Sequence, residues 1–287
     1  MTSVAHAAHS MYHQSSAEPA VKTRLRLLSY NIQAGIASTR PHHYFTQSWK
    51  HVLPHLGSFD NLDRIAHLAS DYDVVALQEV DAGSMRSYFV NQIEYLARRG
   101  HFPYWYHQTN RNLGKFAQHS NGLLSRIQPR DIIEHKLPGL IPGRGLMMVR
   151  YGSDDHPLIV LLAHLALSKR VRLQQFAFIG EIANQYEHVV LMGDLNCQPQ
   201  SNEMETLLEN TRLCEPLEAL HTFPSWRPFR NIDHILVTPS LKVCDMRVLS
   251  HAVSDHLPIA LEIAVPENVH LVGQASSSLH PKGTPRE

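Results

Sequence analysis

Short apolar runs alternate along this chain with segments in which apolar residues recur every three or four positions. The runs are rich in leucine or β-branched residues and are bounded by polar or turn-forming residues, which is typical of β-strands. Many show no polar alternation, so we expect strands buried on both faces. The runs are RLRLLSY, DVVALQ, NGLLS, LMMVRY, PLIVLLA, HVVLM, IDHILV and PIALEIAV.

Apolar positions at helical spacing predict helices that cover the faces of these sheets. One helix is predicted in SFDNLDRIAHLAS and another in RLQQFAFIG, and Ser201 or Asn202 is a suitable N-cap for a third. The pattern therefore indicates an α/β architecture with layered sheets and outer helices. The apolar positions are Leu62, Ile65, Ala66 and Ala69 in the first helix, Leu173, Phe176, Ala177 and Gly180 in the second, and Met204, Leu207 and Leu208 in the third.

Some stretches do not follow either period. Residues 36–60 and the segment HFPYWYHQ at 101–108 are rich in aromatic residues and histidine, and they are interpreted either as functional lids or as loops packed on their own domain. Residues 1–22 are polar and His-rich, and residues 267–287 are rich in Ser, Pro and Gly. We expect both ends to be disordered and residues 23–266 to form one domain.

Composition narrows the class of protein. With 43% hydrophobic and 18% charged residues, the chain is typical of a soluble globular protein with a sizeable core. The formal net charge is zero with histidine neutral, so the chain lacks the broad basic field of a non-specific nucleic-acid binder. This weighs against a general nuclease, although a local basic groove stays possible.

Cysteine usage and hydropathy indicate the compartment. Cys197, Cys214 and Cys244 are an odd number without C-x-x-C spacing, which favours neither a disulfide framework nor a zinc knuckle. No apolar segment approaches the length of a membrane span, and the N-terminus does not resemble a signal peptide. We therefore expect a cytoplasmic protein with no integral membrane segment.

Polar residues stand at the ends of several predicted strands, where side chains from different strands can converge on one rim. Carboxylates and amides are hard oxygen ligands that suit Mg²⁺ or Mn²⁺, and histidines control charge near neutral pH. Zinc is not favoured, because the sequence has neither an H-E-x-x-H motif nor paired cysteines. The residues are Asn31, Glu79, His164, Asp194, Asn196, Asp233, Asp255 and His256.

The motifs around these residues resemble the endonuclease/exonuclease/phosphatase superfamily, which includes pancreatic deoxyribonuclease, AP endonucleases, neutral sphingomyelinases and inositol polyphosphate phosphatases. The resemblance implies a four-layer α/β sandwich, in which two mixed β-sheets pack face to face with helices on the outer faces, and an active site at one end. The motifs occur in the family's order. They are LLSYNIQAG (27–35), DVVALQEVD (73–81), HLALSKRVRLQQ (164–175), LMGDLNCQP (191–199), NIDHILV (231–237) and VSDHLPIALEI (253–263).

The resemblance implies a metal site built on acidic residues. Glu79 would be the principal ligand of Mg²⁺ or Mn²⁺, Asp255 would help to hold the ion, and Asn31 would orient Asp194 or contact the metal shell. AP endonucleases have a carboxylate where this chain has Gln33. That difference argues against an AP endonuclease. The HL pattern with Arg172 and Gln175 downstream is more similar to the sphingomyelinase-like and uncharacterised bacterial branches.

The resemblance also implies the chemistry of hydrolysis. Asp194 and Asn196 would position and activate the attacking water. His256, oriented by Asp233, would bind a phosphoryl oxygen and stabilise the charge that develops there. His164 would contribute a second phosphate contact or assist the leaving group.

Other residues are weaker candidates. Arg144, between Gly143 and Gly145, could touch a substrate phosphate, but a turn leading into a strand is the simpler interpretation. Asn121 could face the site from a neighbouring strand. Arg172 is predicted on the helix that follows His164, where a structural ion pair is expected.

The leading interpretation is a Mg²⁺- or Mn²⁺-dependent hydrolase that cleaves a phosphodiester by in-line attack of water. The substrate could be a nucleic acid, a phospholipid headgroup or a small phosphodiester. A nuclease could use a strip of Arg98, Arg99 and Arg111, and a lipid phosphodiesterase could use the aromatic residues of 36–60 at a membrane. A silent phospho-ligand binding protein ranks lowest, because no metal ligand or base is missing.

Overall fold

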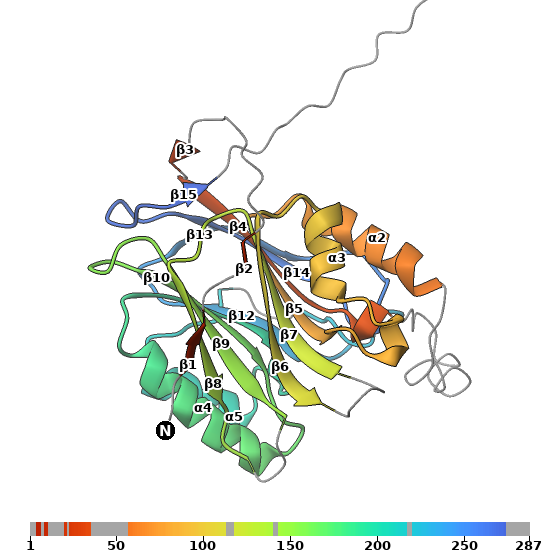
Figure 1. Ribbon diagram of the computed structural model, residues 1–287. Helices are drawn as coiled ribbons and strands as arrows, with labels where there is room; N and C mark the ends of the chain where they lie inside the picture. Colours follow the sequence, from red (N-terminus) through yellow and green to blue (C-terminus); the bar gives the residue numbers. More distant parts are fainter. Residues whose placement is uncertain are drawn as a thin grey trace, which may run out of the picture.

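The computed structural model describes residues 4–6, 9–10, 20–21, 23–35, 57–112, 118–139, 143–216 and 220–273. Its centre is two mixed β-sheets packed face to face (Figure 1). The six-stranded sheet has the order β1 (Val4–His6), β8 (Asp131–Lys136), β9 (Gly145–Tyr151), β10 (Leu158–His164), β11 (His188–Asp194) and β12 (Asp233–Val237). The seven-stranded sheet has the order β13 (Lys242–Val248), β14 (Ile259–Ala264), β4 (Arg24–Asn31), β5 (Val74–Asp81), β7 (Gln118–Ser125), β6 (Tyr104–Asn112) and β2 (His9–Ser10), while β3 (Ala20–Val21) pairs with β15 (Val272–Gly273).

Helices cover the outer face of each sheet (Figure 1). Helices α2 (Gly57–Ala69) and α3 (Gln92–Arg99) pack on the seven-stranded sheet, and α4 (Lys169–Ala183) and α5 (Asn202–Asn210) pack on the six-stranded sheet. The short 3₁₀ helices η1 (Gln33–Gly35) and η3 (Met85–Ser87) follow β4 and β5. The predicted four-layer α/β sandwich is therefore confirmed.

Alternation of side chains along the strands builds the layers. In β4, Leu25 and Leu27 enter the core between the sheets, whereas Leu28 and Tyr30 face the helices. Both sets are buried, because each sheet has a covered face on both sides. This explains why the strand runs show no polar alternation.

The second aromatic stretch, 101–108, lies entirely within the described residues. Residues Tyr104–Asn112 form β6, and Trp105 and Tyr106 are each 8% exposed, so the aromatic run packs into the sheet and is not a lid. Residues 36–56 and most of 1–22 lie outside the described residues, as do 274–287. Val269 and Leu271 pack in the inter-sheet core, which carries the fold past the predicted boundary at residue 266.

The topology gathers the ends of several strands at one edge of the sandwich. Strands β4 and β5 are parallel and place Asn31 opposite Gln78. Strands β10 and β11 are also parallel, and β12 runs antiparallel beside β11 with Asp233 opposite Asp194. Among the described residues, no helix combines the length and the apolar composition needed to cross a membrane.

Candidate active site

Strands β10 and β11 approach closely where the site begins. Gly193 has a φ of +144°, and a Cβ atom added there would lie 1.9 Å from the carbonyl oxygen of Ala163. Only glycine fits, because a side chain would push the two strands apart. The close pairing places His164 and Asp194 opposite each other at the ends of their strands.

The carboxylate of Asp194 is buried and held on both oxygens. Asn31 donates from Nδ2 to Oδ2 over 3.1 Å, and the backbone N–H of Asn196 donates to Oδ1 over 3.0 Å. The Nε2 atom of His164 lies 3.5 Å from the same Oδ2. The side chain of Asn196 donates to the carbonyl of Leu165 over 3.0 Å, so it ties together the segments that follow β10 and β11.

A β-bulge turns Glu79 toward the histidine that faces Asp194. Leu77 and Val80 of β5 both face the helices. They are three positions apart in β5, but their partners in β7, Gly122 and Ser120, are only two positions apart. The extra residue in β5 leaves Glu79 with a φ of +56°, which a non-glycine residue adopts at a conformational cost. The Oε1 atom of Glu79 lies 4.0 Å from Nε2 of His164.

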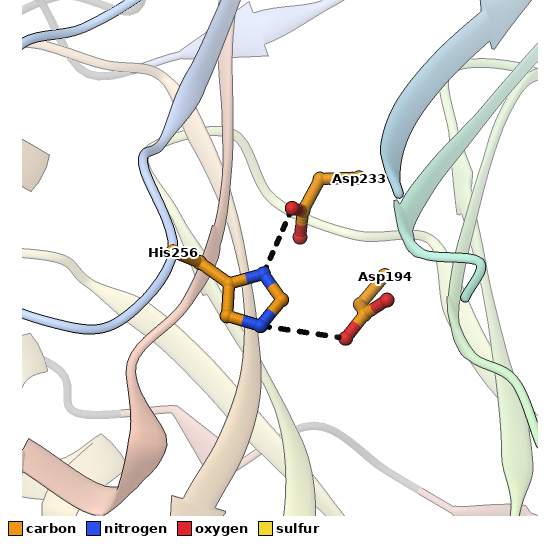
Figure 2. Close-up of side chains that lie close together, drawn as sticks. All are labelled: Asp194, Asp233 and His256. Carbon is orange, nitrogen blue, oxygen red and sulfur yellow. Dashed lines mark hydrogen bonds and ion pairs between the residues drawn. The ribbon is translucent and has the colours of Figure 1, made fainter. Parts of the chain in front are cut away.

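His256 lies between two aspartates (Figure 2). Its Nδ1 atom is 2.8 Å from Oδ2 of Asp233, and its Nε2 atom is 3.9 Å from Oδ2 of Asp194. Thr222 donates to the same oxygen of Asp233 over 2.5 Å. The ring of Phe223 packs against the imidazole with centroids 4.9 Å apart, so the segment before β12 holds both members of the Asp233–His256 pair.

This arrangement sets the charges in the site. Burial and the neighbouring carboxylates of Asp233 and Glu79 raise the pKa of Asp194 to about 7, against the opposing effect of His256 and Asn31. Burial alone would lower the pKa of His256, but the surrounding aspartates outweigh it and raise that pKa to about 10. At neutral pH the imidazole of His256 is therefore protonated. The neighbouring carboxylate of Asp194 titrates near neutral pH.

Asp255 is joined to the site through Gln33. Gln33 donates from Nε2 to Oδ2 of Asp255 over 3.2 Å, and its backbone N–H donates to Oδ1 of Asn31 over 3.2 Å. Ser254 donates to the other oxygen of Asp255 over 3.2 Å. Burial is the main cause that raises the pKa of Asp255 to about 6.

A sequence profile of the Endonuclease/Exonuclease/phosphatase family matches residues 28–256. The chain belongs to this family. The match begins in β4 and ends at His256, and it therefore spans every strand end that contributes to the site. No curated protein matches the sequence.

Solved structures of similar fold include members of the same family. An endonuclease/exonuclease/phosphatase from Beutenbergia cavernae has a TM-score of 0.66 at 20% identity, with 85% of this chain and 72% of that chain covered. A mannosyl-6-phosphatase from Bacteroides thetaiotaomicron has a TM-score of 0.63 at 16% identity, covering 84% and 100%. The human Nocturnin catalytic domain with bound sulfate has a TM-score of 0.60 at 16% identity, covering 86% and 97%. At these identities the likeness shows the fold.

Enzymes of the endonuclease/exonuclease/phosphatase family typically use a divalent metal, and the residues of this site fit one. The Oε1 atom of Gln33 is buried without a hydrogen-bond partner among the described residues. The carboxylate of Glu79 is one of the causes that raise the pKa of Asp255. A divalent cation among these oxygens would satisfy the amide and neutralise the acids.

A second group of side chains in the site has the spacing of a metal cluster, but its histidine is protonated instead of bound to a metal. Ligand atoms of Asp194, Asp233 and His256 lie within 4.8 Å of one another. The 2.8 Å contact of His256 with Asp233 and its raised pKa indicate a protonated ring, which cannot bind a cation. The residues around Glu79 and Asp255 therefore fit a divalent cation better than this group does.

The weaker candidates lie in different places. Arg144 is half-buried in the turn that leads into β9, where its carbonyl accepts a hydrogen bond from the N–H of Leu137. Asn121 is buried in β7 and donates to the carbonyl of Gly145 over 3.3 Å. Arg172 forms the predicted structural ion pair: it contacts Glu203 at 2.5 Å. The roles of Arg144 and Asn121 in substrate binding stay predictions.

Sequence reasoning missed two residues that fix the Asp233–His256 pair. Thr222 and Phe223 belong to the segment before β12, which has neither helical nor strand periodicity. The polar and aromatic run HTFPSW, shortly before the motif NIDHILV, is the signal that could have identified them. The run includes a cis peptide bond between Phe223 and Pro224.

Proposed function

We propose that this protein hydrolyses a phosphodiester by in-line attack of a water that Asp194 activates. One observation supports this most strongly: a buried carboxylate faces both His164 and His256 at 3.5 and 3.9 Å while Asn31 fixes its orientation. A carboxylate with a pKa of about 7 is a stronger base than an ordinary aspartate and is partly ionised at neutral pH. The site thus has a base and a cationic group side by side.

In this proposal Glu79 and Asp255 would hold Mg²⁺ or Mn²⁺, and Asn31 and Gln33 would contribute amide oxygens. When bound, the ion would polarise the phosphoryl group and offset its negative charge. The bulge at Glu79 and the hydrogen bond from Gln33 to Asp255 favour a common location for these side chains.

The water oxygen forms a bond to phosphorus as the bond to the leaving alcohol breaks. Asp194 accepts the proton of the water, and Asn196 keeps the segment after Asp194 in place through its bond to Leu165. The protonated ring of His256, held by Asp233, donates to a phosphoryl oxygen where negative charge develops. His164 either contacts a second phosphoryl oxygen, in which case solvent water protonates the leaving alkoxide, or donates that proton itself.

We favour a small phosphodiester over a nucleic acid as the substrate. The formal net charge is zero, and two of the arginines proposed for a nucleic-acid strip are already paired, Arg98 with Glu94 and Arg99 with Asp63. The side chain of Arg111 and the aromatic residues of 36–56 lie outside the described residues. The net charge and these ion pairs therefore favour a small phosphodiester over a nucleic acid, and a membrane-bound lipid phosphodiesterase stays an alternative. We also propose a cytoplasmic location, consistent with three free cysteines.

The test is hydrolysis of bis-p-nitrophenyl phosphate and p-nitrophenyl phosphate by the purified protein with EDTA, Mg²⁺ or Mn²⁺. We expect cleavage of the diester that EDTA stops and either metal restores. Asp194→Asn should lower kcat by about 10²- to 10⁴-fold without loss of fold. The matched control is Asp131→Asn, because Asp131 pairs with Arg150 in β8, away from the site. Full activity of Asp194→Asn would contradict the proposed base.

A further inference from the structure

Amide side chains form a row across neighbouring strands of the seven-stranded sheet. Asn31 of β4 is opposite Gln78 of β5. The bulge that contains Gln78 lies opposite Asn121 of β7, and Asn121 is opposite Gln108 of β6. All four are at most 4% exposed. The row starts at Asn31, which contacts Asp194, and so it leads away from the hydrolytic centre along the inner face of the sheet.

The row faces inward, toward the six-stranded sheet. In β7, Leu123 belongs to the inter-sheet core and Leu124 to the helix-facing layer, so Asn121 shares the inner face with Leu123. Two amides reach across to β9: Asn121 donates to the carbonyl of Gly145 and Gln108 to that of Leu146, each over 3.3 Å. These bonds fix which end of each amide is nitrogen, because a carbonyl oxygen can only accept.

The oxygens of three of these amides have no hydrogen-bond partner among the described residues. These buried atoms are Oε1 of Gln78, Oε1 of Gln108 and Oδ1 of Asn121. A Cβ atom on Gly145 would lie 2.3 Å from Oδ1 of Asn110 and 2.5 Å from Oε1 of Gln108. Amide oxygens therefore converge above a glycine at the start of β9, next to the turn that carries Arg144.

A buried acceptor without a hydrogen bond raises the free energy of the folded protein. We therefore expect a ligand that binds along this row to donate hydrogen bonds to it. A phosphate group is excluded, because it would bring further acceptors toward carbonyl oxygens. Hydroxyl groups fit, since each can donate one hydrogen bond to an amide oxygen. We propose that the row of Gln78, Asn121 and Gln108 is a subsite for the hydroxyl groups of a polyhydroxylated alcohol whose phosphate is cleaved at Asp194. This assignment rests on the proposed phosphodiesterase function and specifies its substrate class.

The experiment measures binding and not turnover, which separates it from the test of hydrolysis. The Asp194→Asn variant is titrated calorimetrically with glycerol 3-phosphate and, separately, with propyl phosphate, both in the presence of Mg²⁺. The dissociation constants are then compared. Propyl phosphate has the same charge as glycerol 3-phosphate but no hydroxyl groups. We expect glycerol 3-phosphate to bind about tenfold or more tightly. Mannose 6-phosphate in a parallel titration distinguishes a sugar from a glycerol headgroup as the source of the hydroxyls.

Variants of the row test the residues. Gln108→Met and Asn121→Leu keep the approximate size of each side chain and remove its polar atoms, and each should abolish most of the preference for glycerol 3-phosphate over propyl phosphate. Ser120→Ala is the matched control. Its hydroxyl is also buried and has no hydrogen-bond partner among the described residues, but Ser120 is next to Asn121 in β7 and therefore faces the helices.

The outcomes are distinct. Equal binding of the two phosphates by the unmutated row would overturn the subsite, and it would mean that internal water alone satisfies these oxygens. The same holds if Ser120→Ala removes the preference as strongly as Gln108→Met does. Melting curves of each variant identify any that fails to fold, and the second variant of the row then carries the comparison. If the protein cleaves bis-p-nitrophenyl phosphate but shows no preference for glycerol 3-phosphate over propyl phosphate, the proposed hydrolase is supported and the proposed subsite is wrong.

Discussion

One oxygen of Asp194 meets most of the polar side chains at the centre of the site. Oδ2 accepts from Asn31 and lies within 3.9 Å of Nε2 of both His164 and His256. A carboxylate in these surroundings has a raised proton affinity because of its burial and the nearby acids. Its function as a base therefore depends on His256 carrying the compensating charge.

That dependence predicts the effect of Asp233→Asn. The carboxylate of Asp233 helps to raise the pKa of His256 to about 10, so its loss lowers that pKa, and the ring deprotonates at a lower pH. We expect the basic limb of the kcat profile to move to lower pH and kcat at pH 8 to fall by about 10²-fold, with little change in KM. Steady-state kinetics between about pH 6 and 10 measure both effects.

The control for this variant keeps the charge and removes one hydrogen bond. Thr222→Val deletes the donor to Asp233 but leaves its carboxylate beside His256. The shift of the basic limb should then be small or absent. If Asp233→Asn lowers kcat by the same factor at every pH, Asp233 orients the ring without tuning its charge.

Most elements could be predicted because their hydrophobic pattern is local. The predicted segment SFDNLDRIAHLAS begins at the second residue of α2 and ends one residue after the helix. Ser201 caps α5 as expected, because its side chain accepts a hydrogen bond from the N–H of Met204. Each of the apolar runs that predicted strands contributes to one of the two sheets. Strands β6, β8 and β13 and helix α3 were missed. In β6 the aromatic run is followed by the polar residues QTNRN, which hides the strand pattern.

Features that arise from pairing between strands could not be predicted. The bulge at Glu79 depends on how β5 pairs with β7, and the amide row depends on the register of several strands. The polar residues at the strand ends could be named from their motifs, but the contact of Thr222 with Asp233 joins an aperiodic segment to a strand. Gly193 is an intermediate case: its place in GDLN is visible in sequence, and its reason is the approach of Ala163.

The pairing of β10 with β11 predicts that Gly193→Ala is strongly destabilising. The new Cβ would overlap the carbonyl of Ala163, and the residue would have to adopt a φ of +144°. We expect a loss of about 4 kcal/mol or more in the free energy of unfolding. Urea denaturation followed by circular dichroism measures it.

Gly152→Ala is the matched comparison. Gly152 also has a positive φ, of +83°, but a Cβ there would meet no atom closer than 3.5 Å. Its cost should be limited to conformational strain, about 1–2 kcal/mol. Similar losses for both variants would show that strain, and not the contact between β10 and β11, makes Gly193 necessary.

The sandwich as a whole gathers acids from separate strands at one end. Glu79 comes from the end of β5, Asp194 from the end of β11, and Asp255 from the segment before β14. Their shared surroundings raise the pKa of Asp194 and of Asp255, so without a cation their ionisation works against folding. The same family fold supports different substrates, and the substrate therefore has to be inferred from side chains such as the amide row and not from the fold.

A cation that binds these acids must stabilise the entire fold, because the unfolded chain does not bring them together. At a free concentration of about 100 times its Kd, it would add about 2.7 kcal/mol to the free energy of unfolding. This corresponds to an increase in Tm of about 5–10 °C for a domain of this size. We expect Mn²⁺ or Mg²⁺ to raise Tm relative to EDTA, and Glu79→Gln to require a higher metal concentration for the same increase.

The thermal measurement is independent of catalysis, and Asp131→Asn provides its reference. Asp131 is a carboxylate of β8 that pairs with Arg150, so its variant should keep the full response to metal at the original concentration. A response that is equal in Glu79→Gln and Asp131→Asn would remove Glu79 from the metal shell. It would move the ion toward the group of Asp194, Asp233 and His256, whose ligand atoms lie within 4.8 Å of one another, and His256 would then have to be neutral to bind it.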